Sequence, residues 1–130
     1  MKEVYEFLKN SHVFYIATID NNKPRVRPFG AINIFEDKLY FQTGKVKDVY
    51  KQIEANPNVE ISSFIDGRWI RLEGELVVDD RIEAKKSMLD NNPELKSMYS
   101  ADDPNTIVFY IKNAKVSICS FTDKPIYYEF

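Results

Sequence analysis

The sequence predicts an α+β fold, mainly β: a small antiparallel barrel with short flanking helices. Short segments rich in β-branched and aromatic residues recur along the chain. Turn residues typical of hairpins separate several of them, namely Asp20-Asn21-Asn22, Glu36-Asp37-Lys38 and Asp66-Gly67. Helical spacing is confined to a few stretches between these segments. Many short strands joined by hairpins, with helices at the corners, are typical of a small barrel.

Length and composition set the outer limits. At 130 residues, the chain is expected to form one domain spanning residues 1–130. Its 44% hydrophobic and 29% charged residues are ordinary for a globular protein. A formal net charge of −2 argues against nucleic acid or an anionic membrane as a partner. Any basic binding site must therefore be local.

Cysteine and histidine are each represented once, by Cys119 and His12. An intramolecular disulfide is therefore excluded, as are zinc sites that need several cysteines or histidines, and no metal site is predicted. No apolar stretch of the sequence has the length of a signal peptide or a membrane span. We accordingly expect a cytoplasmic protein in a reducing compartment.

The first segments predict a helix and two strands. Apolar residues at helical spacing indicate a helix over residues 2–10, and β-branched and aromatic residues indicate a strand over 13–19. A second strand is expected over residues 25–35. Pro28 has no N–H to donate, so one edge of this strand must be open at that point. An open edge leaves backbone groups free to meet a ligand.

The next segments predict a strand over residues 38–43 and an amphipathic helix after Gly44. Apolar residues of this helix recur at i, i+3, i+4 and i+7, namely Val46, Val49, Tyr50 and Ile53. Its basic residues are Lys45, Lys47 and Lys51, and Asn56-Pro57-Asn58 ends it.

The second half of the chain predicts two long strands, two short helices and a final hairpin. We expect strands over residues 59–65 and 68–78, a helix from Asp79-Asp80 to Leu89, a short helix over 93–98, and a hairpin of strands 106–111 and 115–121 that turns at 112–114. Gly74, inside the longest strand, indicates a bulge or a sharp bend. The tail, residues 124–130, is rich in aromatic residues.

A phosphate site is the chemical function that these patterns favour. We expect the strand that carries Arg25 and Arg27 to bring them toward Thr43 and the start of the helix that carries Lys47. Arginine presents a planar fork of donors that suits phosphate oxygens. The free N–H groups of a helix N-terminus favour the same anion. The alternative is that the arginines are solvated charges on an exposed strand face.

Several stretches together point to a known family. They are Arg25-Val26-Arg27-Pro28-Phe29, Leu39-Tyr40-Phe41-Gln42-Thr43, Lys47, Ile53-Glu54-Ala55-Asn56-Pro57-Asn58-Val59 and Trp69-Ile70-Arg71-Leu72-Glu73-Gly74. In this order and spacing, the chain resembles the FMN-binding split-barrel proteins related to pyridoxamine 5′-phosphate oxidase. It is most similar to the short members, which include general-stress and nitroimidazole-resistance-like flavoproteins.

The resemblance implies an antiparallel split β-barrel that binds FMN at a homodimer interface. The cofactor-binding residues that it implies are Arg25, Val26, Arg27, Pro28, Phe29, Gln42, Thr43, Lys47 and Trp69. Arg25 or Arg27, together with Lys47, would meet the phosphate, and the other residues would lie near the flavin or between flavin and phosphate. Taken without the resemblance, Trp69 is more often a core or interface residue.

Two departures limit what the resemblance implies. Related chains often carry a serine two residues before the phosphate lysine, where this chain has Lys45. The tail Ile126-Tyr127-Tyr128-Glu129-Phe130 has no match to the arginine-containing substrate segment of the longer pyridoxamine-phosphate oxidases. Oxidation of vitamin B6 compounds is therefore not expected, since fold similarity alone does not carry a function over.

The predicted function is that of an FMN-dependent oxidoreductase acting on an unidentified small organic substrate, with its catalytic residues unassigned. In such chemistry the flavin carries the electrons, so the lack of an evident catalytic acid or nucleophile is expected. Two alternatives stay open. One is a flavin-binding or sensor module without turnover, and the other is a split barrel that binds haem or a deazaflavin.

Overall fold

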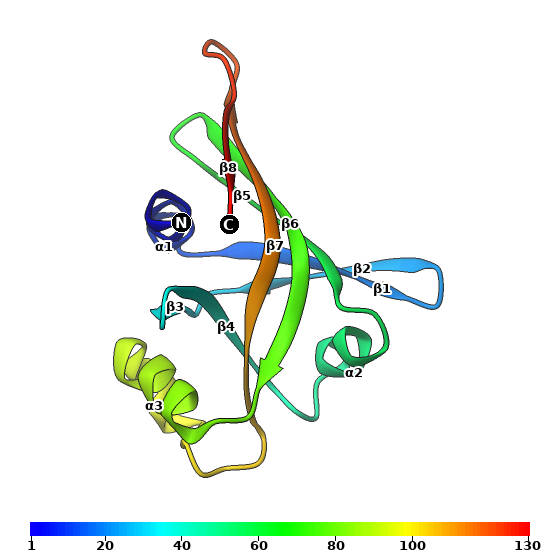
Figure 1. Ribbon diagram of the computed structural model, residues 1–130, viewed down its shortest axis with the longest axis vertical. Helices are drawn as coiled ribbons and strands as arrows, with labels where there is room; N and C mark the ends of the chain where they lie inside the picture. Colours follow the sequence, from blue (N-terminus) through cyan, green and yellow to red (C-terminus); the bar gives the residue numbers. More distant parts are fainter.

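The short strands and tight hairpins build one curved antiparallel sheet (Figure 1). The computed structural model describes residues 1–130. The strands are β1 (Phe14–Asp20), β2 (Lys23–Phe29), β3 (Ile32–Phe35), β4 (Lys38–Gly44), β5 (Asn58–Ile65), β6 (Arg68–Asp79), β7 (Thr106–Ser120) and β8 (Ile126–Glu129). The helices are α1 (Lys2–Ser11), α2 (Asp48–Ala55), α3 (Ile82–Asn91) and the 3₁₀ helix η1 (Pro93–Ser97). The predicted mainly β, α+β split barrel with short flanking helices is confirmed.

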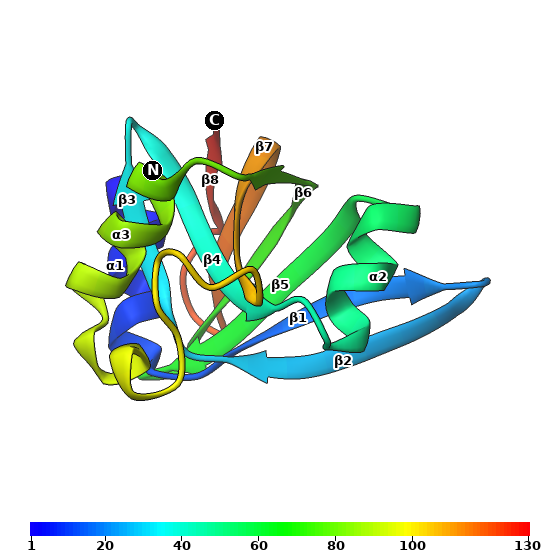
Figure 2. The same ribbon diagram turned by 90° about the horizontal axis from the view of Figure 1, so that it is seen from below.

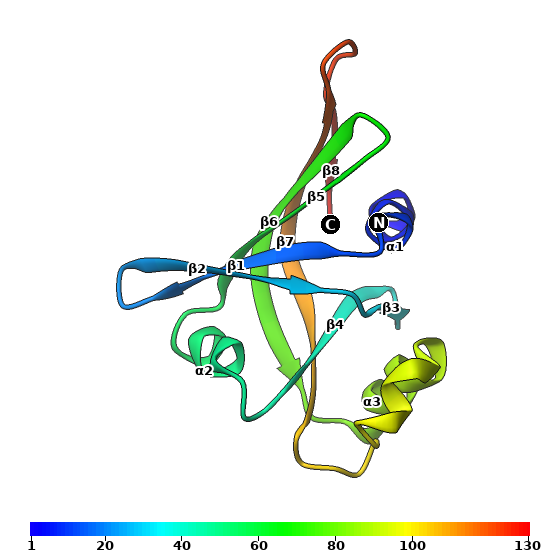
Figure 3. The same cartoon turned by 180° about the vertical axis from the view of Figure 1, so that it is seen from behind.

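The sheet does not close on itself. Its strand order is β2-β1-β5-β6-β7-β4-β3, and β8 pairs with β7 outside this path. β2 and β3 therefore lie at opposite ends of the sheet, each with one unpaired edge. A fully closed barrel, which the many short strands suggested, is therefore not formed. The open edge predicted at Pro28 is present, because β2 pairs with β1 alone. Figures 2 and 3 show α2 beside the β1–β2 hairpin and α3 near β3.

Three two-residue hairpin turns set the register. Their central residues all have positive φ: 47° and 75° in Asn21-Asn22, 49° and 59° in Glu36-Asp37, and 53° and 72° in Asp66-Gly67. Turns of this hand match the twist of the strands they join. All three turns lie where the sequence predicts them.

The strand predicted over residues 25–35 is two strands. The chain leaves the sheet at Gly30 and Ala31, because β2 pairs with β1 at one end of the sheet while β3 pairs with β4 at the other. The alternation of side chains between the two faces of the sheet, expected along one continuous strand, therefore stops at Gly30. This corner brings the end of β2 close to the end of β4.

The hairpin predicted around residues 112–114 is wrong, because β7 runs through this region as one strand of 15 residues. Opposite Gly74 of β6, β7 carries an extra residue, and Asn113 has φ 54°. The resulting bulge confirms the irregularity predicted from Gly74. A Cβ at Gly74 would lie 2.7 Å from Ile111 Cγ1 and 2.9 Å from the Lys112 carbonyl oxygen, so glycine is needed there. The aromatic tail forms β8.

The main core lies between the concave face of the sheet and α1. Its fully buried members include Val4, Leu8, Phe14, Phe41 and Phe109. A smaller cluster, Tyr40, Ala84, Met88 and Val108, packs α3 against the outer side of β4 and β7. None of the helices is both long enough and apolar enough to cross a membrane.

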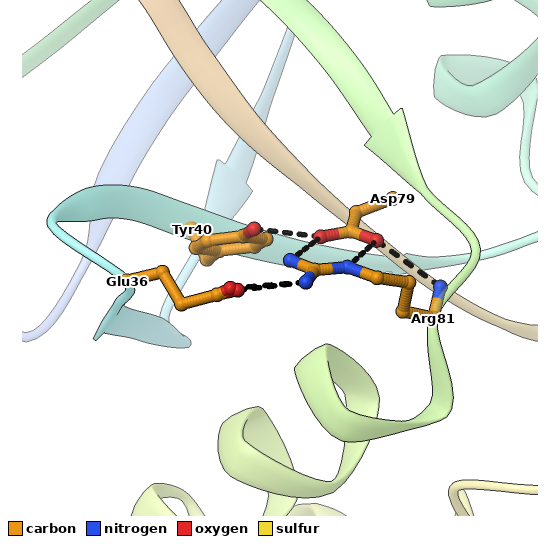
Figure 4. A network of polar contacts seen from close by, with 4 residues as sticks. All are labelled: Glu36, Tyr40, Asp79 and Arg81. Atoms are coloured by element: carbon orange, nitrogen blue, oxygen red, sulfur yellow. Dashed lines mark hydrogen bonds and ion pairs between the residues drawn. The ribbon is translucent and has the colours of Figure 1, made fainter.

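A polar network fastens the start of α3 to the sheet (Figure 4). The buried Tyr40 hydroxyl donates to Asp79 Oδ2 at 2.7 Å, and Arg81 Nε and Nη2 donate to the two Asp79 oxygens at 3.1 and 2.9 Å. Arg81 Nη1 also contacts both Glu36 oxygens, at 2.7 and 2.9 Å. Arg81 thus connects the end of β6 with the β3–β4 turn, and Asp79 connects both with Tyr40 of β4.

This network makes stability depend on pH. The hydrogen bonds from Arg81 lower the pKa of Asp79 to about 2, against an ordinary value of 3.8. The unfolded chain therefore takes up a proton at Asp79 before the folded chain does, and stability falls as the pH drops from about 5 toward 2. We expect Asp79 to account for about 2 kcal/mol of this loss.

Asp79→Asn should accordingly flatten the acid limb of a plot of unfolding free energy against pH. Denaturant titrations between pH 7 and 3 measure this. Asp90→Asn is the matched control, because Asp90 forms an exposed pair with Lys96. Parallel acid limbs for wild type and Asp79→Asn would contradict the assignment.

Candidate functional site

Two adjoining clefts open where β2, the end of β4 and the start of α2 meet. The inner cleft, about 350 Å³, is lined by β2 and the corner after it, by Gln42 and Thr43, by Lys47 and Val49, and by residues of η1 and the segment after it. The outer groove, about 920 Å³, lies between the β1–β2 hairpin and α2. The two share Arg27, Pro28, Lys47 and Val49.

All but one of the residues implied by the resemblance line these two clefts. Arg25 and Val26 line the outer groove, Phe29, Gln42 and Thr43 line the inner cleft, and Arg27, Pro28 and Lys47 line both. Trp69 lines neither. The end of β2 and the end of β4, which are far apart in the sheet order, are thus brought together across the clefts.

Arg27 is held in a fixed position beneath α2. Its Nη1 donates to the Ile16 carbonyl oxygen at 3.1 Å and to Thr18 Oγ1 at 2.8 Å, and its Nη2 donates to Gln52 Oε1 at 2.5 Å. Thr18 Oγ1 donates to the same Gln52 oxygen at 2.5 Å. Burial lowers the pKa of Arg27, and the nearby Asp48 carboxylate opposes this shift. The guanidinium is therefore a preorganised cation with donors left over.

Arg25 is placed differently. Its Nε donates to Asp20 Oδ2 at 3.2 Å near the tip of the β1–β2 hairpin, and its side chain is half exposed. The sequence did not decide whether Arg25 or Arg27 would meet a phosphate. The geometry favours Arg27 for an anion held in the inner cleft.

The sequence predicted that Lys47 lies within the helix, but the structure places it immediately before α2. The helix begins at Asp48, because residues 44–47 form a separate turn in which the Lys47 N–H donates to the Gly44 carbonyl oxygen at 3.0 Å. Lys47 forms no ion pair within the chain. Its position at the positive end of α2 adds a mobile charge to the cleft.

Gln42 carries unused hydrogen-bonding capacity. Its residue is only 7% exposed, and neither Nε2 nor Oε1 has a partner within the chain. Buried polar groups in folded proteins are nearly always hydrogen-bonded, so an unpaired amide beside a cleft calls for a partner from outside the chain.

Sequence reasoning missed several residues of the site. Gln52 follows Val49 by three residues and so faces the same side of α2, a signal that helical spacing contains. Thr18 is recognisable only through its contact with Gln52. Nothing in the sequence pattern connects Leu95, Met98 or Tyr99 with β4, because about fifty residues separate them along the chain.

Trp69 lies on the convex face of the sheet, away from the clefts. Its ring is 5.0 Å from that of Phe121, and its strand neighbours are Phe64 and Cys119. Register and alternation place Trp69 on the same face as Tyr15, which itself pairs with Pro28 of β2. Within one chain, Trp69 therefore shares a face of the sheet with Pro28, but β5 and β1 lie between them and Trp69 lines neither cleft.

Comparison with known proteins decides the family. The family model of pyridoxamine 5′-phosphate oxidase matches residues 1–119. The chain belongs to this family. The resemblance drawn from the sequence is thereby confirmed.

Solved structures share the fold of this chain. A NimC/NimA family protein from Clostridium acetobutylicum is 44% identical, with a TM-score of 0.97 over 100% of this chain and 92% of that one. General stress protein 26 from Bacillus anthracis is 22% identical, with a TM-score of 0.77 over 99% and 98%. A pyridoxamine 5′-phosphate oxidase-related, FMN-binding protein from Nostoc punctiforme is 16% identical, with a TM-score of 0.70 over 98% and 91%. The comparison with curated proteins gives no match.

The Arg27 network leads to a prediction about Gln52. Gln52→Leu keeps a helix-forming side chain of similar size but removes the oxygen that Thr18 and Arg27 share. We expect a loss of about 1–3 kcal/mol in unfolding free energy, the range for buried donors left without a partner. Denaturant titration measures it. Lys51→Ala, at the neighbouring exposed position, should cost no more than about 0.5 kcal/mol, and equal losses in the two variants would contradict the network's role.

Proposed function

We propose that the chain is an FMN-binding flavoprotein that serves as an oxidoreductase for a small organic substrate, with the cofactor held in the inner cleft. The observation that carries this proposal is the convergence of Arg27, Thr43 and Lys47 in the inner cleft. Two cations and a hydroxyl beside a helix start suit a phosphate. Membership of the pyridoxamine 5′-phosphate oxidase family supports the same ligand.

The residues present fit FMN as a whole. The phosphate would lie with Arg27, Thr43 and Lys47, and the flavin ring would extend along Pro28 and Phe29. The unpaired amide of Gln42 offers one donor and one acceptor to the polar edge of the ring. The unpaired edge of β2 offers backbone groups as well.

The protein's share in the chemistry is orientation and electrostatics. Bound FMN supplies the electron transfer, and the chain's residues bind it, position it and limit access of water. Arg27 is preorganised by Thr18 and Gln52, so little side-chain entropy is lost when an anion binds it. No side chain of the cleft is assigned a proton-transfer role.

We propose further that two copies form the working unit and that Trp69 contributes to the site of the partner. The convex face exposes large apolar residues: Tyr15, Val26, Phe64, Phe121 and Tyr127. Several large exposed apolar residues on one face are typical of an interface. A two-fold interface on this face would produce two equivalent sites. Such pairing would also bring Trp69 of one copy toward β2 of the other.

The alternatives differ in ligand or in turnover. A flavin-binding module without turnover would use the same cleft. Haem would need another arrangement if histidine were its ligand, because His12 lies at the C-terminal end of α1 and lines neither cleft. A deazaflavin phosphate would use the same cations. The absorbance spectrum of the purified protein separates these ligands.

The phosphate assignment predicts that FMN binds well and riboflavin binds poorly, as measured by fluorescence titration. Lys47→Ala should weaken FMN binding by about 1.5–3 kcal/mol, the range for a hydrogen bond to a charged group. Riboflavin binding should change little, because riboflavin lacks the phosphate. Equal affinities of the wild type for the two compounds would overturn the assignment.

Lys45→Ala is the matched control for Lys47→Ala. Lys45 is two residues away and exposed, and it lines neither cleft. Lys51→Ala, in the outer groove, should also cost less than Lys47→Ala. If all three changes cost the same, Lys47 is only part of a diffuse basic surface.

The shared site predicts that Phe64→Arg, on the convex face and 61% exposed, converts the dimer to a monomer and weakens FMN binding. Analytical ultracentrifugation with and without FMN measures both effects. Val46→Arg is the control, because Val46 is even more exposed, at 78%, and lines neither cleft. A monomer that binds FMN at full affinity would refute the shared site.

A further inference from the structure

The inner cleft has a second end that phosphate binding leaves free. This end is formed by η1 and the residues after it, Glu94, Leu95, Met98 and Tyr99, which face the β2 corner across the cleft. We infer that it selects flat aromatic cations as substrates, with Glu94 as the residue that determines this specificity. The inference rests on the proposed function, because it takes the cation-rich end of the cleft to be filled by the FMN phosphate.

The wall of this end is firmly attached to the sheet. Asn92, just before η1, is buried, and its Nδ2 donates to the carbonyl oxygens of Ile32 and Met88, both at 3.1 Å. Beyond η1, the Tyr99 N–H donates to the Leu95 carbonyl oxygen at 2.8 Å. A Cβ at Gly44 would lie 3.1 Å from the Tyr99 hydroxyl, so this ring closes tightly on the end of β4. The wall is therefore a fixed surface.

Apart from Glu94, this wall presents apolar and aromatic side chains to the cleft. Met98 is 68% exposed although it is a large apolar residue, and it lines the cleft beside the partly buried Leu95. In the FMN-loaded protein, the flavin ring along Phe29 would face it from the β2 corner, beside Ala31. An aromatic ring system on one side and apolar side chains on the other favour a planar ring between them, with a thioether adapting to its edge.

Charge decides which planar ring this end prefers. Glu94 is the only carboxylate that lines the inner cleft, and it forms no ion pair within the chain. The nearby Lys96 does not neutralise it, because its Nζ is paired with Asp90 at 3.0 Å. The cations of the cleft, Arg27 and Lys47, would be neutralised by a bound phosphate. An uncompensated carboxylate then remains, which attracts cations and repels anions.

Three bicyclic aromatic compounds of similar size test this inference: 1-methylquinolinium as the cation, quinoline as the neutral ring and naphthalene-1-sulfonate as the anion. Each is titrated calorimetrically into FMN-loaded protein at pH 7. We expect the cation to bind about 5-fold more tightly than the neutral ring, and the anion to bind at least 10-fold more weakly than the cation. Glu94→Gln should equalise cation and neutral ring, whereas Glu83→Gln, on α3 and outside the cleft, should change nothing.

Several outcomes would overturn the inference. They are an anion that binds as well as the cation, an unchanged cation preference in Glu94→Gln, or binding of none of the three compounds. FMN loading is verified by absorbance before each titration, which keeps failure of the proposed function separate. If no FMN binds, the proposed function fails and this inference, which rests on it, fails with it; if FMN binds and the cation preference is absent, only the inference fails.

Discussion

The pairing of β6 with β7 is the interaction on which the rest of this structure depends. These are the longest strands, and they cross the molecule from end to end (Figure 1). The bulge opposite Gly74 divides the pair into two parts. On one side of it, β6 joins β5 and β7 joins β8, while on the other side β7 joins β4. Because a bulge increases the local twist, the two parts turn away from each other and the sheet stays open.

The ligand cleft follows from this division. β2 belongs to the part of the sheet organised by β5, and β4 belongs to the part organised by the other end of β7. The chain must pass from one part to the other at Gly30 and return through α2. Arg27, Thr43 and Lys47 lie at these crossing points. The site is thus a product of the strand order, and its residues come from segments that do not pair with each other.

Two polar networks give this open structure local rigidity where it matters. One fastens Arg27 to β1 and α2, and the other fastens α3 to β4 through Tyr40, Asp79 and Arg81. The first fixes a cation at one end of the cleft. The second, together with Asn92, fixes the wall that carries Glu94 at the other end. The fold is shared across the family, and the fold alone does not decide what binds beside this wall.

The sequence by itself determined the local features of this protein. Tight turns such as Asp66-Gly67, the open edge at Pro28 and the irregularity at Gly74 follow from backbone chemistry that acts over a few residues. The basic and hydroxyl residues of the site were also recognisable, because they occur in the order typical of the family. Only the tertiary structure decided which ends of the sheet meet. It divided the strand at Gly30, carried β7 past Asn113 without a turn, and placed Gln52 and Glu94 at the cleft. These outcomes depend on contacts between segments that are distant along the chain, and a periodic pattern in the sequence carries no information about such contacts.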